Sequence, residues 1–303
     1  MIKEKKENSV SIVIPHYNGR ELLERNLPRV FQAAENPINC VIEVIVVCDG
    51  TTDDSVSFLK KNFPEVKVIK HKINRGFSAA VNTGARMSKG SYLVLLNNDL
   101  YPQINFLEEV LPFISKDPSI FGVSFHEKGW GWAKGEFERG YVVHLPGKED
   151  TTPQHTFFVN AGGAIYRRDI WMSLGGMDEQ LFSPFYWEDV DISYRALKRG
   201  HELYWHPGAF VSENLSASVG KIPKKKVSRI QERNQLIFNW KNLTSPNLFR
   251  KHLLGVLQRV VRHPGYMIII LMAVRRLKNI LKARAKEKKE EKLSDEAILQ
   301  SFN

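Results

Sequence analysis

Cysteine is nearly absent from this 303-residue sequence, in which Cys40 and Cys48 are the only two. If residues 41–47 form one strand, the two sulfur atoms lie about 26 Å apart along it, at roughly 3.3 Å per residue. A disulfide requires Cα atoms within about 7 Å of each other, so these two residues cannot pair. Two unpaired cysteines are typical of a reducing compartment, and we therefore expect a cytoplasmic protein.

Long hydrophobic runs are also missing. The longest, Tyr266 to Val274, falls well short of the roughly 20 residues that a membrane-spanning helix needs. Met1 to Asn8 is charged and leads directly into a strand pattern, which argues against a signal peptide. The chain has no internal repeat, and no low-complexity block precedes its tail. These features predict a soluble or peripheral globular protein.

Acidic residues are fewer than basic ones, but the excess of positive charge is local. The chain has 44 Lys and Arg against 33 Asp and Glu, a net charge of +11. The segment from Arg275 to Lys292 holds nine Lys and Arg and three Glu, and so supplies +6 of that charge. The remaining body is only mildly basic, so nucleic acid is not an expected partner. Hydrophobic residues make up 43% of the chain, which is ample for a core.

The first 120 residues alternate between short apolar runs and segments with helical spacing. In chain order, we predict a strand at 10–14, a helix at 20–34, a strand at 41–47, a helix at 52–62 capped by Thr51 or Thr52, a strand at 66–69, a helix at 78–88 and a strand at 92–96. Apolar strands that alternate with helices indicate a parallel sheet with helices on both faces. The predicted fold is α/β, with a mostly parallel, Rossmann-like sheet.

Beyond Phe121 the pattern changes to Gly- and aromatic-rich loops with short strands. We predict strands at 156–159, 164–166 and 201–206, helices at 188–198 and 227–240, and an exposed loop at 221–226. Gly200 stands where it can end the helix at 188–198. We place a soft boundary near Ile120 and expect the two halves, 1–120 and 121–240, to share one core. A helical, basic extension follows at 241–303.

The stretch from Gly90 to Asp99 is the most informative part of the sequence. It predicts a buried strand that ends in two amides and a carboxylate, Asn97, Asn98 and Asp99. Ligands of open α/β sheets bind just beyond the carboxyl ends of the strands. A hard oxygen ligand such as Asp99 can hold a divalent cation against a phosphate there. The alternative is a solvated turn, because Asn and Asp are ordinary turn residues.

No Gly-x-Gly-x-x-Gly or Walker-type loop follows the first strand, where Pro15-His-Tyr-Asn-Gly19 stands instead. A dinucleotide-binding or P-loop protein is therefore a weak hypothesis. The aromatic ring of Tyr17 and the amide of Asn18 can instead stack on a nucleobase and hydrogen-bond it. Asp49, at the end of the second predicted strand, can accept a hydrogen bond from a pyrimidine N–H, with an ordinary Asp-Gly turn as the alternative.

Acidic residues gather at the predicted start of the helix at 188–198. Helix capping alone explains Glu188, Asp189 and Asp191, since acids prefer first turns. The aromatic residues at 182–187 favour a chemical role, because sugars stack on such rings, although some of these rings can belong to the core. A carboxylate here can act as a general base on a hydroxyl, a contribution of roughly 10²–10⁴-fold.

Five segments, in this order, resemble the family 2 inverting glycosyltransferases. They are Ile12-Val-Ile-Pro15-His-Tyr-Asn18, Cys48-Asp49-Gly-Thr-Thr-Asp53, Asn74-Arg-Gly76 through Asn82-Thr-Gly84, Leu96-Asn97-Asn-Asp99 and Trp187-Glu-Asp189-Val-Asp191. The resemblance covers roughly residues 9–239 and is to bacterial rhamnosyltransferase-like members. It implies a glycosyltransferase A-type fold, a nucleotide-sugar donor and a divalent metal, Mg²⁺ or Mn²⁺.

The resemblance also implies roles for matching residues. Asp49 would recognise the base, Asp99 would bind the metal, and Asp189 would be the general base. Donor-binding residues would be Pro15, Tyr17, Asn18, Asp49, Asn74, Gly76, Asn97, Asn98 and Asp99, and acceptor-binding residues Gly162, Gly163, Trp187 and Glu188. Residues 1–120 would then bind the nucleotide sugar, and 121–240 the acceptor.

Three positions depart from the family pattern. Cys48 stands where an acid often precedes the base-recognising residue, and Asn97 replaces the first acid of the metal motif. The metal-binding His that often follows the strand after the catalytic helix is also missing. Glu213 lies in the aligned stretch, and we expect it to replace that His as a metal ligand. His206 lies on the wrong side of the strand and is expected to be structural.

The tail leaves two interpretations open. Leu277, Ile280 and Leu281 fall on one helical face among basic residues, so residues 265–292 can lie on an anionic membrane surface. The protein would then be peripheral on the inner face of the cell membrane, which suits a lipid-linked acceptor. Alternatively, residues 268–274 pack on the body and a solvated, charged tail follows.

The sequence thus predicts metal-dependent, inverting transfer of a sugar from a UDP- or dTDP-sugar to a hydroxyl of a glycan or lipid-linked acceptor, in cell-envelope polysaccharide synthesis. A sugar nucleotidyltransferase is one alternative, but it requires a Gly-rich basic loop that residues 15–19 do not provide. A non-catalytic protein that binds nucleotide sugars or polyanions is another, suggested by Asn97.

Overall fold

The computed structural model describes residues 8–213 and 223–302. The strands are β1 (Val10–His16), β2 (Val41–Asp49), β3 (Lys67–His71), β4 (Tyr92–Leu96), β5 (Leu100–Pro102), β6 (Ile120–Glu127), β7 (Ala133–Glu138), β8 (Tyr141–Pro146), β9 (Gln154–His155), β10 (Gly163–Arg167) and β11 (Glu202–Glu213). The helices are α1 (Arg20–Glu35), α2 (Ser55–Asn62), α3 (Phe77–Met87), α4 (Val110–Lys116), α5 (Arg168–Leu174), α6 (Glu188–Lys198), α7 (Lys224–Asn242), α8 (Pro246–Arg262), α9 (Met267–Val274), α10 (Leu277–Glu290) and α11 (Asp295–Gln300).

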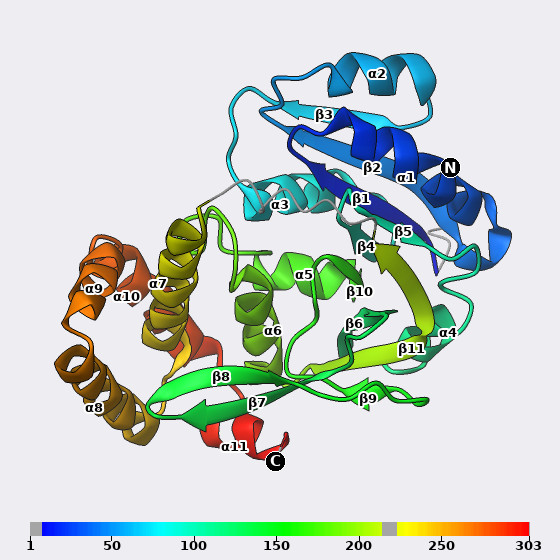
Figure 1. Cartoon of the computed structure of the whole chain (residues 1–303). Coiled ribbons are helices and arrows are strands. Elements are labelled where there is room, and N and C mark those ends of the chain that lie inside the picture. Colours follow the sequence, from blue (N-terminus) through cyan, green and yellow to red (C-terminus); the bar gives the residue numbers. More distant parts are fainter. Residues whose placement is uncertain (1–7, 214–222, 303) are drawn as a thin grey trace.

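Within the described residues, nine strands form one sheet in the order β3-β2-β1-β4-β10-β6-β11-β5, with β9 paired to β11 (Figure 1). Strands β3, β2, β1 and β4 are parallel. Strand β10 runs antiparallel to both β4 and β6. The predicted α/β fold is therefore confirmed, with a parallel first half and one reversed strand in the middle. Because of this reversal, the carboxyl end of β4 lies beside the amino end of β10.

Hydrophobic clusters cover both faces of the sheet. Ile12 and Ile14 of β1 pack with α1, α2 and α4 on one face, and Val13 packs with α3, α5 and α6 on the other. All three side chains are at most 2% exposed. Burial on both faces explains why these strands read as continuous apolar runs rather than as alternating patterns. Strands from both sides of the soft boundary near Ile120 belong to this one sheet.

Some predicted elements are wrong. Helix α2 begins at Ser55 after Asp54, not at Thr52 after a threonine cap, because Asp53 instead accepts hydrogen bonds from the backbone N–H groups of Gly19 and Arg20. Of the loop predicted at 221–226, residues 221 and 222 lie outside the described residues, and the three lysines at 224–226 open α7, in keeping with the good helix propensity of lysine.

Residues 156–159 do not form a strand, because their backbone N–H groups do not form the regular hydrogen bonds of a sheet. The N–H of Val159 donates to Ser193 Oγ at 3.0 Å, and that of Phe157 donates to the carbonyl of Ala133 at 2.8 Å. A separate hairpin of β7 and β8, which sequence patterns did not reveal, lies beside this segment.

The helical C-terminal extension is present, and its α10 packs on α7. Ile280 is fully buried, and Arg284 donates from Nη1 to the carbonyl of Trp240 at 2.9 Å. Leu277 and Leu281 remain exposed. Of the three residues on the predicted apolar face, only Ile280 is buried against the body. Among residues 8–213 and 223–302, no helix has both the length and the apolar character required to cross a membrane.

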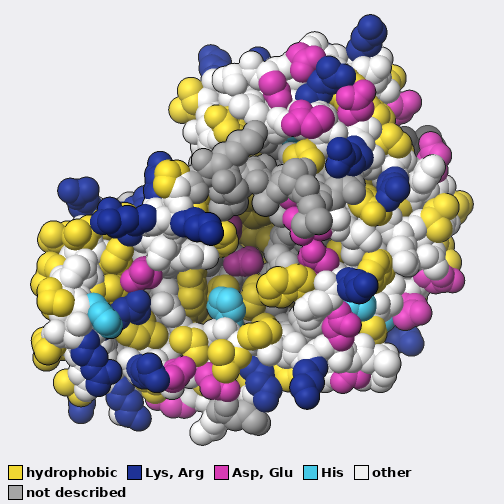
Figure 2. Space-filling view, in the orientation of Figure 1, with side chains coloured by type: hydrophobic (Ala, Val, Ile, Leu, Met, Phe, Trp, Pro, Cys, Tyr) yellow, Lys and Arg dark blue, Asp and Glu magenta, His cyan; other side chains and the backbone are white. Residues whose placement is uncertain are grey.

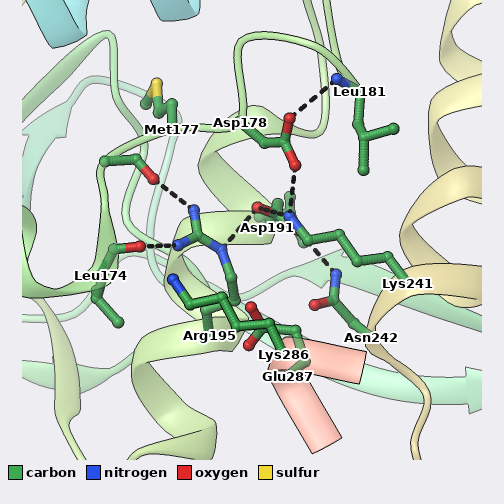
Figure 3. Close-up of polar contacts among 12 residues, drawn as sticks. Leu174, Met177, Asp178, Leu181, Asp191, Arg195, Lys241, Asn242, Lys286 and Glu287 are labelled. Atoms are coloured by element: carbon green, nitrogen blue, oxygen red, sulfur yellow. Dashed lines mark hydrogen bonds and ion pairs between the residues drawn. The ribbon is translucent and has the colours of Figure 1, made fainter. Parts of the chain in front are cut away.

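A buried ionic network joins α6 to α7 (Figure 3). Asp191 has no exposed surface and accepts hydrogen bonds from Arg195 Nε at 2.8 Å, Lys241 Nζ at 2.9 Å and Asn242 Nδ2 at 2.9 Å. Burial acts to raise the pKa of Asp191, but Lys241 and Arg195 outweigh it and hold that pKa below its ordinary value. The last acid of Trp187-Glu-Asp-Val-Asp191 is therefore a structural anchor.

Replacing Asp191 with Asn should lower the free energy of unfolding by about 3–5 kcal/mol, because two buried cations lose their shared counter-charge. Urea unfolding measures this change. The matched control is Asp54→Asn, which removes one partner of an exposed pair with Arg20 and should change stability by less than about 1 kcal/mol. An equal, small effect of both substitutions would contradict the anchoring role.

Candidate active site

Polar ends of several elements converge on one side of the sheet. The carboxyl ends of β1, β2 and β4 carry the segments at 15–19, 49–53 and 97–99, and the reversed β10 begins beside the last of them. Figure 2 shows a hollow on this face of the molecule, with acidic side chains and a histidine around it. The convergence of strand ends with a hollow defines the candidate site.

Asp49 is 3% exposed, and its carboxylate is fully engaged by the following loop. It lies 2.6 Å from His71 Nδ1 and accepts backbone N–H groups of Arg75 at 3.0 Å and Gly76 at 2.8 Å. Gly50 has φ +69°, and a Cβ there would lie 2.2 Å from the backbone nitrogen of Asn74. The Asp-Gly pair thus anchors the loop at 73–76, and base recognition by Asp49 stays a prediction.

The loop after β1 is tied to the loop after β2. Asn18, at φ 53°, accepts the backbone N–H of Thr52 at 2.8 Å, and Asp53 accepts that of Gly19 at 2.8 Å. Pro15 is half-buried opposite Val47 in the ladder. Tyr17 is 48% exposed, so its ring is available for stacking.

The other predicted donor residues occupy loop positions as well. Asn74, itself exposed, accepts the backbone N–H of Gly76 at 3.0 Å. Asn98 Nδ2 lies 2.9 Å from His16 Nδ1, which links the ends of β4 and β1. His16 was not singled out by its sequence, because its role depends on two neighbouring strands.

Carboxylates crowd together beyond β4. Strand β11 pairs with β5 so that Glu213 lies opposite Leu100, next to Asp99. Burial, and then the negative charge of Glu213, raises the pKa of Asp99 above its ordinary range. Burial and Glu213 likewise raise the pKa of Glu127, at the end of β6. The structure therefore brings the two predicted metal ligands together and adds Glu127, which the sequence had not indicated.

These carboxylates do not by themselves make a complete metal site. In the part of the chain that the structure describes, no three His, Cys, Asp or Glu side chains are arranged to hold a metal ion. A magnesium site at a phosphate, however, commonly uses only one or two protein carboxylates together with phosphate oxygens and water. The hard oxygens and mutual repulsion of Asp99 and Glu213 fit such a partial site.

The backbone is strained just before α6. Tyr186 and Trp187 have φ of 72° and 74°, a left-handed conformation that costs about 1–3 kcal/mol for each non-glycine residue. Buried Asn234 of α7 holds this segment, because its Nδ2 lies within hydrogen-bonding distance of the carbonyl oxygens of Phe182, Phe185 and Tyr186 at 2.8 to 3.0 Å. No local pattern indicates this contact, which spans about fifty residues.

Two adjacent acids open α6. Burial raises the pKa of Asp189 to about 6, although the backbone N–H groups of Val190 and Ala161 act to lower it. Burial and the charge of Asp189 raise the pKa of Glu188 to about 8. Glu188 Oε2 is buried and has no hydrogen-bond partner among the described residues. The helix dipole acts to lower the pKa of an acid in the first turn, and burial outweighs it for both of these acids.

The turn at Ala161-Gly162 connects these acids to the end of β4. On one side, the backbone N–H of Ala161 lies close enough to Asp189 to act on its pKa and lower it. On the other, the carbonyl of Gly162 accepts the N–H of Asn97 at 2.7 Å. A Cβ on Gly162 would lie 3.0 Å from Asn97 Nδ2, so glycine permits this close approach. Gly163 begins β10 opposite Leu96.

Aromatic rings line the side next to Asp189. The ring of Trp187 lies 5.1 Å from that of Phe238 and 5.6 Å from that of His144, between centroids. His144 belongs to β8 and also contacts Phe158. Trp187 is therefore partly buried, and its predicted role in binding the acceptor stays a prediction.

The fold defines a class of proteins, the glycosyltransferases of A type. A solved structure of GalNAc-T7 with UDP, GalNAc and Mn²⁺ superimposes with a TM-score of 0.63 over 86% of this chain and 57% of that one, at 16% sequence identity. Residues 11–175, more than half of the chain, match Glycosyl transferase family 2. The chain therefore belongs to glycosyltransferase family 2, as the five segments predicted.

Bacterial relatives agree with this assignment. An uncharacterised glycosyltransferase of Haemophilus influenzae is 25% identical over 193 residues, 62% of each chain. The uncharacterised glycosyltransferase YwdF of Bacillus subtilis is 28% identical over 242 residues, 75% of this chain and 84% of that one. The chain thus spans less than two thirds of the first of these relatives. Resemblance to rhamnosyltransferases in particular is not tested by these matches.

Replacing Asp189 with Asn should raise the free energy of unfolding near pH 8 by about 1–3 kcal/mol. The folded-state pKa lies above the ordinary value, so stability is lost as the pH rises from about 4 to about 6 and does not change further above that range. Asn cannot ionise, and the gain should vanish near pH 4. Urea unfolding at the two pH values measures both effects.

The matched control is Asp169→Asn. Asp169 also stands in a first helical turn and accepts the next backbone N–H at 2.8 Å, as Asp189 does. It is exposed, so its substitution should change stability by no more than about 0.5 kcal/mol at either pH. A large loss of stability in Asp189→Asn would show that Asp189 is a structural cap.

Proposed function

We propose that this protein transfers a sugar from a UDP- or dTDP-sugar to a hydroxyl of a glycan or lipid-linked acceptor, with inversion at the anomeric carbon. The observation that carries the proposal is the Ala161-Gly162 turn, whose Ala161 N–H acts on Asp189 on one side and whose Gly162 carbonyl accepts the N–H of Asn97 on the other. Two residues of this turn therefore lie between the proposed general base, Asp189, and the segment from Asn97 to Asp99. Membership of family 2 supports glycosyl transfer as the reaction class.

The donor would lie across the ends of β1, β2 and β4. The ring of Tyr17 is exposed and would stack on the base, and the loop at 73–76, which Asp49 anchors, would offer backbone groups to the donor. Asp99 and Glu213 would hold a Mg²⁺ or Mn²⁺ ion at the diphosphate. When bound, such an ion neutralises the charge that builds on the leaving diphosphate. GalNAc-T7, which shares the fold, was solved with UDP and Mn²⁺.

Asp189 would act as the base. A hydroxyl of the acceptor is a poor nucleophile until its proton is removed in the transition state. The raised pKa of Asp189 brings its basicity closer to neutral pH, which favours proton transfer. Because one carboxylate removes the proton while the diphosphate leaves from the opposite face, the transfer takes one step and inverts the anomeric carbon.

Glu188 and the aromatic side would serve the acceptor. Glu188 carries its proton at neutral pH, because its pKa is raised to about 8, and so can donate a hydrogen bond to a hydroxyl. Trp187 and His144 provide ring faces on the same side. We assign the acceptor to cell-envelope polysaccharide synthesis, and residues 1–120 and 121–240 to donor and acceptor binding.

Release of nucleoside diphosphate from a panel of UDP-, dTDP- and GDP-sugars, with Mn²⁺, Mg²⁺ or EDTA, tests the proposal. Metal-dependent release from one donor should fall by about 10²–10⁴-fold in Asp189→Asn and persist in Asp169→Asn. In the wild type, release should decline as the pH falls through about 6, where Asp189 takes up a proton. Equal release by the two variants would contradict the role of Asp189.

Glu213→Gln tests the metal hypothesis. The concentration of Mn²⁺ required for half-maximal release should rise by at least about tenfold, because a neutral amide replaces a charged oxygen ligand. Glu202→Gln is the control, since Glu202 begins the same strand at its other end. If Glu213→Gln and Glu202→Gln need the same metal concentration, Glu213 is not a ligand.

A further inference from the structure

An apolar surface lies outside the active site, on α8 and α9. Leu254, Leu257 and Val261 of α8 are 59%, 61% and 73% exposed, and Ile268 and Leu271 of α9 are 46% and 57% exposed. The short 3₁₀ turn at Pro264–Tyr266 joins the two helices directly. We call these five residues the α8–α9 face. An exposed apolar patch of this kind marks an interaction surface.

The exposed side chains lie on one side of α8. Leu248, His252 and Gly255 face inward and are buried, whereas the leucines and valine stand at positions one turn apart on the other side. The inward side is anchored, since His252 Nδ1 lies 2.7 Å from the carbonyl of Gly140. Helix α8 therefore already packs on the body through one side, and its exposed apolar residues form a second side.

Positive charge surrounds the α8–α9 face. Between Glu232 and Glu287 the sequence has twelve Lys and Arg and no Asp or Glu. Lys251, Arg262 and Arg275 belong to this stretch and are exposed. Figure 2 shows hydrophobic and basic side chains side by side over the part of the molecule where Figure 1 places α8 and α9.

We propose that the α8–α9 face docks the protein onto an anionic lipid bilayer, with its leucine, isoleucine and valine side chains at the acyl boundary and Lys251, Arg262 and Arg275 at the phosphates. An interfacial helix combines an apolar side with flanking cations, and both features are present here. This surface shares α9 with the stretch expected at 265–292 and adds α8 to it. The proposal goes beyond glycosyl transfer and does not depend on it.

Charge argues against a second copy of this chain as the occupant. Two α8–α9 faces brought together would place their cations opposite each other without an acid from the same stretch to compensate them. Like charges across an interface oppose association. A bilayer supplies both an apolar interior and a dense layer of negative charge, which matches the whole surface.

Docking would also bring the active site close to the bilayer. Helix α9 packs on α7, and Phe238 of α7 contacts the ring of Trp187 beside Asp189. One helix thus separates the α8–α9 face from the aromatic side of the site. A lipid-linked acceptor at the bilayer would be presented near Trp187. This consequence for the acceptor is the part of the proposal that rests on the proposed function.

Co-sedimentation of the full chain with vesicles tests the proposal. The two vesicle types are phosphatidylcholine alone and an equal mixture of phosphatidylcholine and phosphatidylglycerol. The wild type should bind the mixed vesicles, bind less as salt is added, and bind phosphatidylcholine at least about tenfold more weakly. Equal binding to both vesicle types, or binding to neither, overturns the proposal.

Two variants separate the contributions. Changing Leu254, Leu257 and Val261 to Ser should weaken binding by at least about tenfold through lost apolar contact. Changing Lys251, Arg262 and Arg275 to Gln should weaken it by a similar factor through lost charge. The control changes Ile42, Met87 and Ile104 to Ser, which are exposed elsewhere on the molecule, and should bind as the wild type does.

Thermal unfolding checks that the variants fold. If the Ser variant does not fold, the Gln variant still tests the proposal. Sedimentation velocity of the wild type without lipid addresses the other occupant. A dimer that dissociates in the Ser variant, without binding to vesicles, would show that the α8–α9 face joins two copies. Undiminished vesicle binding in both variants would show that another surface is responsible. Either result overturns the proposal.

Discussion

The reversal of β10 within an otherwise parallel group of strands is the constraint on which the site depends. If β10 were parallel to β4, the start of β10 would lie at the opposite end of the strand from the end of β4. Because β10 runs antiparallel beside β4, its entry turn returns to the exit of β4, and the Asn97–Gly162 hydrogen bond closes the gap. Asp189 lies next to Ala161 of the same turn, whose N–H acts on its pKa. One register therefore fixes the distance between two motifs that lie about ninety residues apart in the sequence.

The four acids at 188, 189, 191 and 99 illustrate how position divides similar side chains between stability and chemistry. Asp191 is surrounded by two cations and an amide, and its charge is stabilised. Glu188 is buried and Asp189 is half-buried, one turn away or less, and no cation among the described residues stabilises their charge. The charge of Asp99 is opposed by burial and by the carboxylate of Glu213. Groups whose ionisation is opposed are typical of functional sites, where the bound substrate or ion changes the balance.

The sequence predicted the elements whose pattern is local. Strands β1, β2 and β4 read as apolar runs because both of their faces are buried, and α6 was bounded correctly by its acids and by Gly200. The β7–β8 hairpin was missed because only a few of its residues are buried, so its alternation is weak. Asn234 and Glu127 were missed for another reason. Their roles follow from contacts with α6 and β11, which no local pattern encodes.

The long acid-free stretch between Glu232 and Glu287 has a consequence for how the surface of α8 and α9 responds to its surroundings. A typical protein surface changes its charge in mild acid, as its carboxylates take up protons. This surface has no carboxylate of its own, and of its two histidines, His252 is buried with its pKa lowered to about 4. Apart from His263, which is exposed, the charge of α8 and α9 is therefore constant across mild acid and neutral conditions. Ionic strength, rather than acidity, is the variable that governs what this part of the molecule attracts.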